Sequence, residues 1–114
     1  MGKLGIMIAS DTPQRVRVAL SLALHTAELP EAERPDNLEV FFFAESTALL
    51  ASAPDDVRQM MQELRQRGIL LEACTNLVKS YQVEDAARAL DIALLMANQT
   101  FSRWAREGYA ILSF

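Results

Sequence analysis

The stretch Leu38-Glu-Val-Phe-Phe-Phe-Ala44 decides the fold class. Successive side chains of a β-strand point to opposite faces of its sheet, so three adjacent phenylalanines must be buried on both faces. Both faces of the sheet must therefore be covered. This pattern is typical of a parallel sheet that lies between two layers of helices.

Strand-like runs and helical patterns alternate along the whole chain, which at 114 residues fits one domain, 1–114. The runs rich in strand formers are 3–9, 38–44, 69–74, about 92–96 and 109–114, and the helical patterns lie at 12–29, 54–67, 83–90 and around Trp104. The run 92–96 is interpreted as a short strand, with a continuing helix as the alternative. The order predicts a three-layer α/β/α fold with a five-stranded, mainly parallel, flavodoxin-like doubly wound sheet.

The helix expected at 12–29 is more apolar than one buried face requires. Thr12 is expected to cap it, with Pro13 at the first helical position. Its apolar residues leave only a narrow polar strip, which consists of Arg17, Ser21, His25 and Glu28. So apolar a helix in a short chain indicates a surface that is buried between subunits.

Composition excludes several classes of protein. The formal net charge is −4 and no block of Lys or Arg exists, so nucleic acid and anionic membranes are poor partners. No apolar run reaches the ~18–20 residues of a membrane-spanning helix. No secretory signal is recognised, and one cysteine permits neither an internal disulfide nor a zinc site, so the cytoplasm is the expected location. No glycine-rich loop or metal-ligand set is found, so neither a cofactor nor a metal is expected.

Reactive groups of an open α/β sheet collect beyond the carboxyl ends of its strands. The candidates at these ends are Ser10, Asp11, Ser46, Cys74, Thr75 and Asn76. A helix that begins near Thr75 directs its free N–H groups at the sulfur of Cys74, which favours the thiolate. Lys79, about one turn further on, adds positive charge. Cys74 is therefore the candidate nucleophile, with the other residues supporting it.

The same residues also have structural interpretations. Free cysteines are usually buried and inert, so Cys74 as a packed core residue is an equal alternative. Asp11 is better explained as a helix cap than as an acid catalyst. His25 is expected on the surface, far from the strand ends, so no Cys–His pair forms. The other residues expected to be structural or unpaired are Glu45, Glu72, Phe101 and Trp104.

Several stretches together resemble the DsrE/DsrF-like family of small sulfur-relay proteins. They are the first strand with its Pro-started helix, the runs 40–44, 46–50 and 68–76, and the ending Gly108-Tyr-Ala-Ile-Leu-Ser-Phe114. The most specific element is Ala73-Cys-Thr-Asn76 followed by Leu77. The resemblance spans nearly the whole chain.

The resemblance implies a three-layer α/β/α domain that assembles into trimers or hexamers, and it implies a persulfide carried on Cys74. Thr75 stands where many members have Gly, and no second cysteine is present, so sulfur must pass to or from another protein. Two hypotheses stay open. One is a sulfur-relay protein, at most a sulfurtransferase-like carrier, with donor and acceptor proteins. The other is a non-catalytic oligomeric binding or assembly module with a structural cysteine, and a ligand-binding enzyme is disfavoured.

Overall fold

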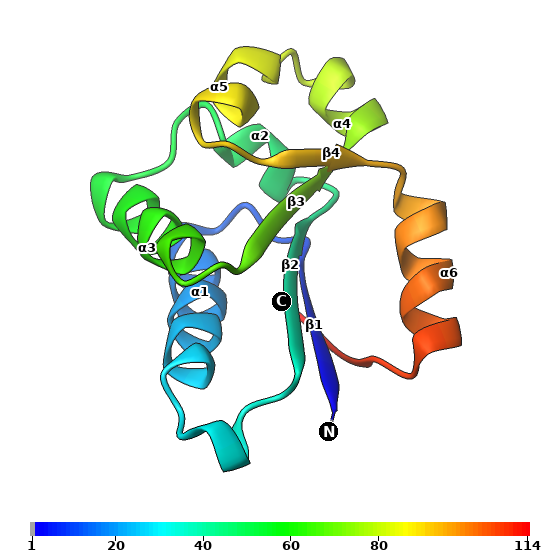
Figure 1. Cartoon of the computed structure of the whole chain (residues 1–114). Coiled ribbons are helices and arrows are strands. Elements are labelled where there is room, and N and C mark those ends of the chain that lie inside the picture. Colours follow the sequence, from blue (N-terminus) through cyan, green and yellow to red (C-terminus); the bar gives the residue numbers. More distant parts are fainter. Residues whose placement is uncertain (1) are drawn as a thin grey trace.

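The computed structural model describes residues 2–114. Its centre is a five-stranded parallel sheet (Figure 1). The strands are β1 (Lys3–Ile8), β2 (Asn37–Phe42), β3 (Leu70–Cys74), β4 (Ala93–Leu95) and β5 (Ala110–Ser113). Their spatial order is β4-β3-β2-β1-β5, and all neighbours run parallel. The predicted sheet is confirmed, including the short strand within 92–96.

Helices cover both faces of this sheet and its carboxyl edge. They are α1 (Pro13–Ala27), α2 (Ser46–Leu49), α3 (Asp55–Gln66), α4 (Thr75–Ser80), α5 (Glu84–Ala89) and α6 (Ala97–Glu107), with a 3-10 turn η1 (Glu31–Glu33). In Figure 1, α1 and α3 lie on one side of the sheet, α6 lies on the other, and α2, α4 and α5 lie beyond the strand ends. The predicted three-layer α/β/α arrangement is confirmed. The sequence did not predict η1 or α2, each of which is a single short turn.

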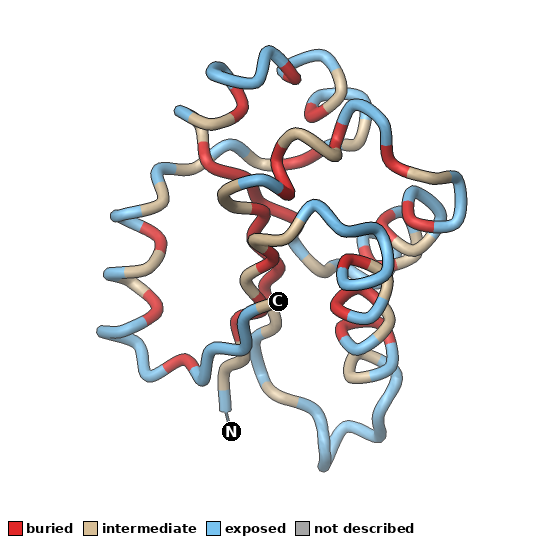
Figure 2. The backbone as a smooth tube through the Cα atoms, turned by 180° about the vertical axis from the view of Figure 1, so that it is seen from behind, coloured by how far each residue is buried: buried red, intermediate tan, exposed pale blue. Residues whose placement is uncertain are grey.

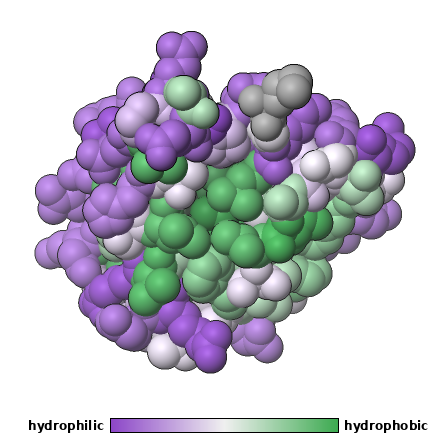
Figure 3. Space-filling model, turned by 90° about the horizontal axis from the view of Figure 1, so that it is seen from below, coloured by the Kyte–Doolittle hydropathy of each residue, from purple (hydrophilic) through white to green (hydrophobic). Residues whose placement is uncertain are grey.

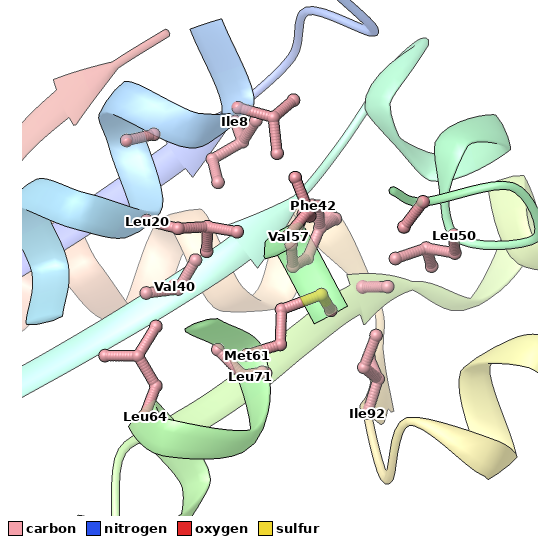
Figure 4. Close-up of a cluster of buried hydrophobic side chains, with 14 of the residues drawn as sticks. Ile8, Leu20, Val40, Phe42, Leu50, Val57, Met61, Leu64, Leu71 and Ile92 are labelled. Carbon is pink, nitrogen blue, oxygen red and sulfur yellow. The ribbon is translucent and has the colours of Figure 1, made fainter. Parts of the chain in front are cut away.

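The face packed against α1 and α3, here the aliphatic face, holds the larger core. Its strand residues point to the same side because they alternate along β1, β2 and β3; they are Ile6, Ile8, Val40, Phe42, Leu71 and Ala73. Leu20 of α1 and Leu64 of α3 close over them (Figure 4). Buried residues recur along the central strands and along the inner sides of these helices (Figure 2).

The opposite face, here the α6 face, is aromatic. Phe41 points to this side, and its ring centroid lies 5.1 Å from that of Phe101 and 6.3 Å from that of Trp104. Trp104 is fully buried, and a Cβ on Gly5 would lie 2.7 Å from its ring. Glycine is therefore required for this close approach. Both faces are covered, as the three adjacent phenylalanines predicted.

The start of α1 differs in part from the prediction. Thr12 occupies the position before the helix and Pro13 begins it, but the Thr12 side chain makes no capping hydrogen bond. Instead, the Thr12 backbone N–H donates to Ser10 Oγ at 3.1 Å. Asp11 is exposed and does not occupy the cap position. The predicted cap position of Thr12 and the start at Pro13 are therefore confirmed, whereas the predicted capping role of Asp11 is wrong, because Ser10 makes the side-chain hydrogen bond in this turn.

None of the helices in residues 2–114 combines the length and the apolar character needed to cross a membrane.

Candidate functional site

Cys74 ends β3 and occupies the position before the first residue of α4. It is only 5% exposed. It lies on the α6 face in a cluster with Phe41, Trp104 and Tyr109, and the partly buried residues around this cluster include Phe43, Leu77, Leu95, Ala97 and Phe101. The predicted place of the cysteine at the carboxyl edge is confirmed. The structure adds that the thiol is packed among apolar side chains.

Three of the predicted supporting residues lie in α4, directly after Cys74. Thr75 and Asn76 open this helix, so their backbone N–H groups are among those that have no helical partner. Lys79 is exposed in its last turn. Within residues 2–114, no hydrogen bond or ion pair joins any of these side chains to Cys74. Their role toward the sulfur stays a prediction.

Ser46 has a structural role at the same edge. Its buried hydroxyl donates to the backbone oxygens of Ile8 at 2.5 Å and Phe43 at 2.9 Å. Its backbone N–H donates to the oxygen of Ala9 at 2.9 Å. Ser46 therefore ties the carboxyl ends of β1 and β2 together and is occupied in doing so. Ser10 is likewise engaged with Thr12, and Asp11 stays exposed.

A pair of buried carboxyl groups lies on the α6 face, one pleat before Cys74. Glu72 pairs in register with Phe41, and Glu39 pairs with Leu70, so the two glutamates are diagonal neighbours on the same face. Glu72 is fully buried and Glu39 is 9% exposed. Carboxyl groups are almost never so buried unless a partner compensates the loss of water.

Glu39 has such partners, and they come from α6 and the residue before β5. Arg103 donates two hydrogen bonds to its carboxylate, from Nη2 to Oε1 at 2.6 Å and from Nη1 to Oε2 at 3.0 Å. The indole N–H of Trp104 donates to Oε1 at 3.3 Å, and the Tyr109 hydroxyl donates to Oε2. Burial pushes the pKa of Glu39 up, but these donors and Glu72 outweigh it and hold that pKa at about 2.

Glu72 has no donor of this kind. Neither of its carboxyl oxygens accepts a hydrogen bond from a described residue, and the group that faces it is the Glu39 carboxyl. Burial, and then the neighbouring Glu39, raises the pKa of Glu72 to about 9. At neutral pH, Glu39 is therefore the carboxylate and Glu72 is the neutral acid, which holds the proton between them.

Sequence reasoning missed this pair, although a signal for it was present. Glu39 and Glu72 each interrupt an apolar strand run, Leu38–Ala44 and Ile69–Cys74. Once both faces of a sheet are known to be covered, a glutamate inside such a strand must be buried. From the sequence, Glu45 alone was considered as a partner for Glu72 in an acid–base pair, and Glu45 lies beyond β2 and not within it. Pairing two strand positions from adjacent runs would have found Glu39.

The family model for the DsrE/DsrF-like family matches residues 3–114, which is nearly the whole chain. The chain belongs to the DsrE/DsrF-like family. This confirms the resemblance that the strand ends and the step at Cys74 indicated. Within residues 2–114, no group of three or more His, Cys, Asp or Glu residues could hold a metal ion. Cys74 and the two buried glutamates are therefore the chemical groups that this DsrE/DsrF-like chain offers on its α6 face.

Three solved structures share the fold. A conserved protein of unknown function from Bacteroides thetaiotaomicron, BT1422, is 22% identical with a TM-score of 0.85, over 98% of this chain and 94% of that one. MTH1491 from Methanobacterium thermoautotrophicum, also of unknown function, is 19% identical with a TM-score of 0.80 over the whole of both chains. The YchN protein of E. coli is 16% identical with a TM-score of 0.74, again over both whole chains. A search of curated protein sequences found no match.

Proposed function

We propose that this DsrE/DsrF-like protein carries sulfur as a persulfide on Cys74. The supporting observation is the position of the thiol, which ends a parallel strand and directly precedes a helix in a chain that the family model covers. The carboxyl edge of such a sheet is where reactive groups of α/β proteins collect. Because the sequence has one cysteine, both steps of a relay involve a second protein.

The chemistry needs a thiolate and no acid–base machinery. The Cys74 thiolate attacks the outer sulfur of a donor persulfide, R–S–SH. A new S–S bond forms to Cys74, the donor S–S bond breaks, and its electron pair leaves on the donor as R–S⁻. An acceptor thiolate then attacks the outer sulfur of Cys74–S–SH, and Cys74 leaves as the thiolate. No net oxidation occurs in either step. Such a carrier needs a reducing compartment, and we place it in the cytoplasm.

A second candidate function is a binding or assembly module in which Cys74 is only a packing residue. The observation that favours it is the burial of Cys74 at 5% exposure, among apolar and aromatic neighbours. A thiol in such surroundings is typically inert. The two candidates differ in whether the sulfur becomes accessible in the native protein.

Sulfur loading separates these candidates. The native protein is incubated with a small-molecule persulfide donor, and intact mass spectrometry then measures the adduct. A carrier gains the mass of one sulfur atom, and Cys74→Ser gains none. An established persulfide carrier in the same tube shows that the donor is active. If that carrier loads while this protein does not, the carrier function is wrong and the assembly module stands.

We also propose that the working unit is a homo-oligomer, a trimer or hexamer, that buries the apolar surface of α1 and β5. Val18 and Leu22 on α1 are 49% and 37% exposed, and Ile111 and Leu112 on β5 are 48% and 42% exposed. β5 is an edge strand with β1 as its single neighbour. Figure 3 shows hydrophobic side chains gathered into one broad area on one face of the molecule. A face of this kind marks a protein interface.

The oligomer has a direct test. Light scattering coupled to size exclusion should give a mass that is a multiple of 12.7 kDa. Leu22→Lys should lower that mass, because an ammonium group is then placed in the apolar contact. A wild-type mass of 12.7 kDa at all concentrations would contradict the proposal.

A further inference from the structure

One helix, α6, shares a buried cluster with Cys74 and also contacts the buried acid pair. Among the helices in residues 2–114, it alone lies on its side of the sheet (Figure 1). Ala97 and Phe101, in its first half, pack against the cluster that contains Cys74. Arg103 and Trp104, in its second half, donate to Glu39. Because a helix is a stiff element, a displacement of its second half at Glu39 is transmitted to its first half.

We propose that a proton shared between Glu72 and Glu39 holds α6 closed over Cys74, and that loss of this proton opens α6 and exposes the thiol. The consequence for sulfur relay rests on the proposed function of Cys74. The proposed opening of α6 does not rest on that function, because it depends on the acid pair alone.

The closed arrangement is balanced in charge. The Glu39 carboxylate faces the Arg103 guanidinium, and Glu72 contributes a neutral acid that donates to Glu39. The other titratable groups around the pair are Tyr109, which donates to Glu39, Lys3, which lies over the Tyr109 ring, and Arg67, which follows α3. Glu107 of α6 adds a second carboxylate, 3.5 Å from Arg103 and 3.8 Å from Lys3, so Lys3 balances its charge. Of these cations, Arg103 alone forms an ion pair with Glu39 among the described residues. The pair therefore has a direct countercharge for one carboxylate.

Loss of the proton upsets this balance. Two carboxylates then face one guanidinium, and the fully buried Glu72 carries a charge with no hydrogen-bond donor among the described residues. A hollow of about 580 Å³ lies beside the pair, lined by Glu39, Glu72 and Arg103 together with Leu70 and Leu95. Water that enters from this hollow hydrates the new charge only where the side chains of α6 move aside. Opening therefore withdraws Phe101 and Ala97 from the cluster that contains Cys74.

Trp104 reports on this change directly. It is the one tryptophan of the sequence, it is fully buried, and its indole N–H donates to Glu39. In the full chain, we expect its fluorescence emission and its quenching by acrylamide to change in one step centred near pH 9. Glu72→Gln keeps the shape and a donor toward Glu39 but cannot ionise, so it should remove the step. Tyr109→Phe should retain the step, which distinguishes it from tyrosine ionisation.

A wild-type protein with no step between pH 7 and 10, or a Glu72→Gln protein with the wild-type step, would overturn the proposal. If Glu72→Gln does not fold, carbon NMR of the wild-type Glu72 carboxyl replaces it. A carboxyl carbon that titrates near pH 9 supports the shared proton, and one that titrates near the ordinary value of 4.5 contradicts it.

Labelling of Cys74 by iodoacetamide, at a fixed pH of 7, tests the link between α6 and the thiol. Arg103→Met removes the countercharge without touching the cysteine, and we expect labelling to be about tenfold faster, the change that ~1.4 kcal/mol produces in an opening equilibrium. Arg17→Met, on an exposed ion pair between α1 and α3, serves as the matched control and should label at the wild-type rate. Equal rates in all three proteins would show that α6 does not control access. Because labelling does not require sulfur transfer, a protein that opens but never loads refutes only the carrier function.

Discussion

The two faces of the sheet are built on different principles. The aliphatic face packs Ile, Val and Leu side chains of the sheet against α1 and α3, and the charged residues that are buried in residues 2–114, Glu39 and Glu72, both lie on the other face. The α6 face packs aromatic rings around two glutamates, one arginine and the single cysteine. Apolar packing alone is sufficient to hold a helix on a sheet, as α1 and α3 show. The α6 face therefore carries groups that the fold itself does not require.

Buried ion pairs add little to stability compared with apolar residues of the same volume. A leucine at the position of Glu72 would continue the pattern of β3 without any need for a proton or a donor. The acid pair on the α6 face instead makes the attachment of this one helix depend on protonation. This difference between the faces points to α6 as the movable element, and it has measurable consequences.

The largest expected effect comes from removing the countercharge of the α6 face. Arg103→Met leaves the Glu39 carboxylate with Tyr109 and Trp104 as donors, and we expect the free energy of unfolding at pH 7 to fall by about 2 kcal/mol. This is below the usual loss for a fully buried pair because the Arg103 side chain is 32% exposed. Denaturant titration measures the change.

The matched variant on the other side of the sheet should have a much smaller effect. Arg17 Nε lies 2.6 Å from Asp56 Oδ2, but the two side chains are 36% and 56% exposed, so water screens the pair. Arg17→Met should therefore leave the free energy of unfolding nearly unchanged. Equal losses for Arg17→Met and Arg103→Met would remove the distinction between the two faces.

Most of the fold could be predicted from the sequence because local patterns determine it. Phe41, Phe42 and Phe43 required two covered faces, and the structure places Phe41 and Phe42 on opposite sides. The start of α1 could be predicted in position but not in its hydrogen bonds, because the Thr12 side chain makes no capping bond and the Thr12 backbone N–H donates to Ser10 Oγ. Such local competition depends on backbone geometry that a single sequence does not specify.

The sequence predicted where Cys74 lies in the fold, but it did not predict which side chains surround it. Cys74 lies at the predicted strand end, since the end of a strand follows from the apolar run before it. It is buried in a cluster with Trp104 and Tyr109, which come from segments much later in the chain. The pair of Glu39 and Glu72 depends in the same way on the register between β2 and β3. Hydrophobic periodicity predicts local secondary structure, so it does not predict contacts between segments that are distant in the sequence.

The pH dependence of the free energy of unfolding tests the central claim, that Glu72 holds a proton in the folded protein. Its folded-state pKa of about 9 lies above its ordinary value of 4.5, so its contribution is complete below pH 4.5 and is lost as the pH rises to 9. The folded-state pKa of Glu39, about 2, lies below its ordinary value of 4.5. The contribution of Glu39 to the free energy of unfolding is therefore complete above pH 4.5 and is lost as the pH falls below that value.

Between pH 5 and 9, the free energy of unfolding of the wild type should therefore decline by about 1.4 kcal/mol per pH unit at most. Glu72→Gln should show no such decline. Leu64→Ala, on the aliphatic face, should keep the wild-type slope and lower the free energy by the same amount at every pH, because it removes a buried side chain on the side of the sheet opposite Glu39 and Glu72. A flat wild-type profile over this range, or a Glu72→Gln profile with the wild-type slope, would contradict the account.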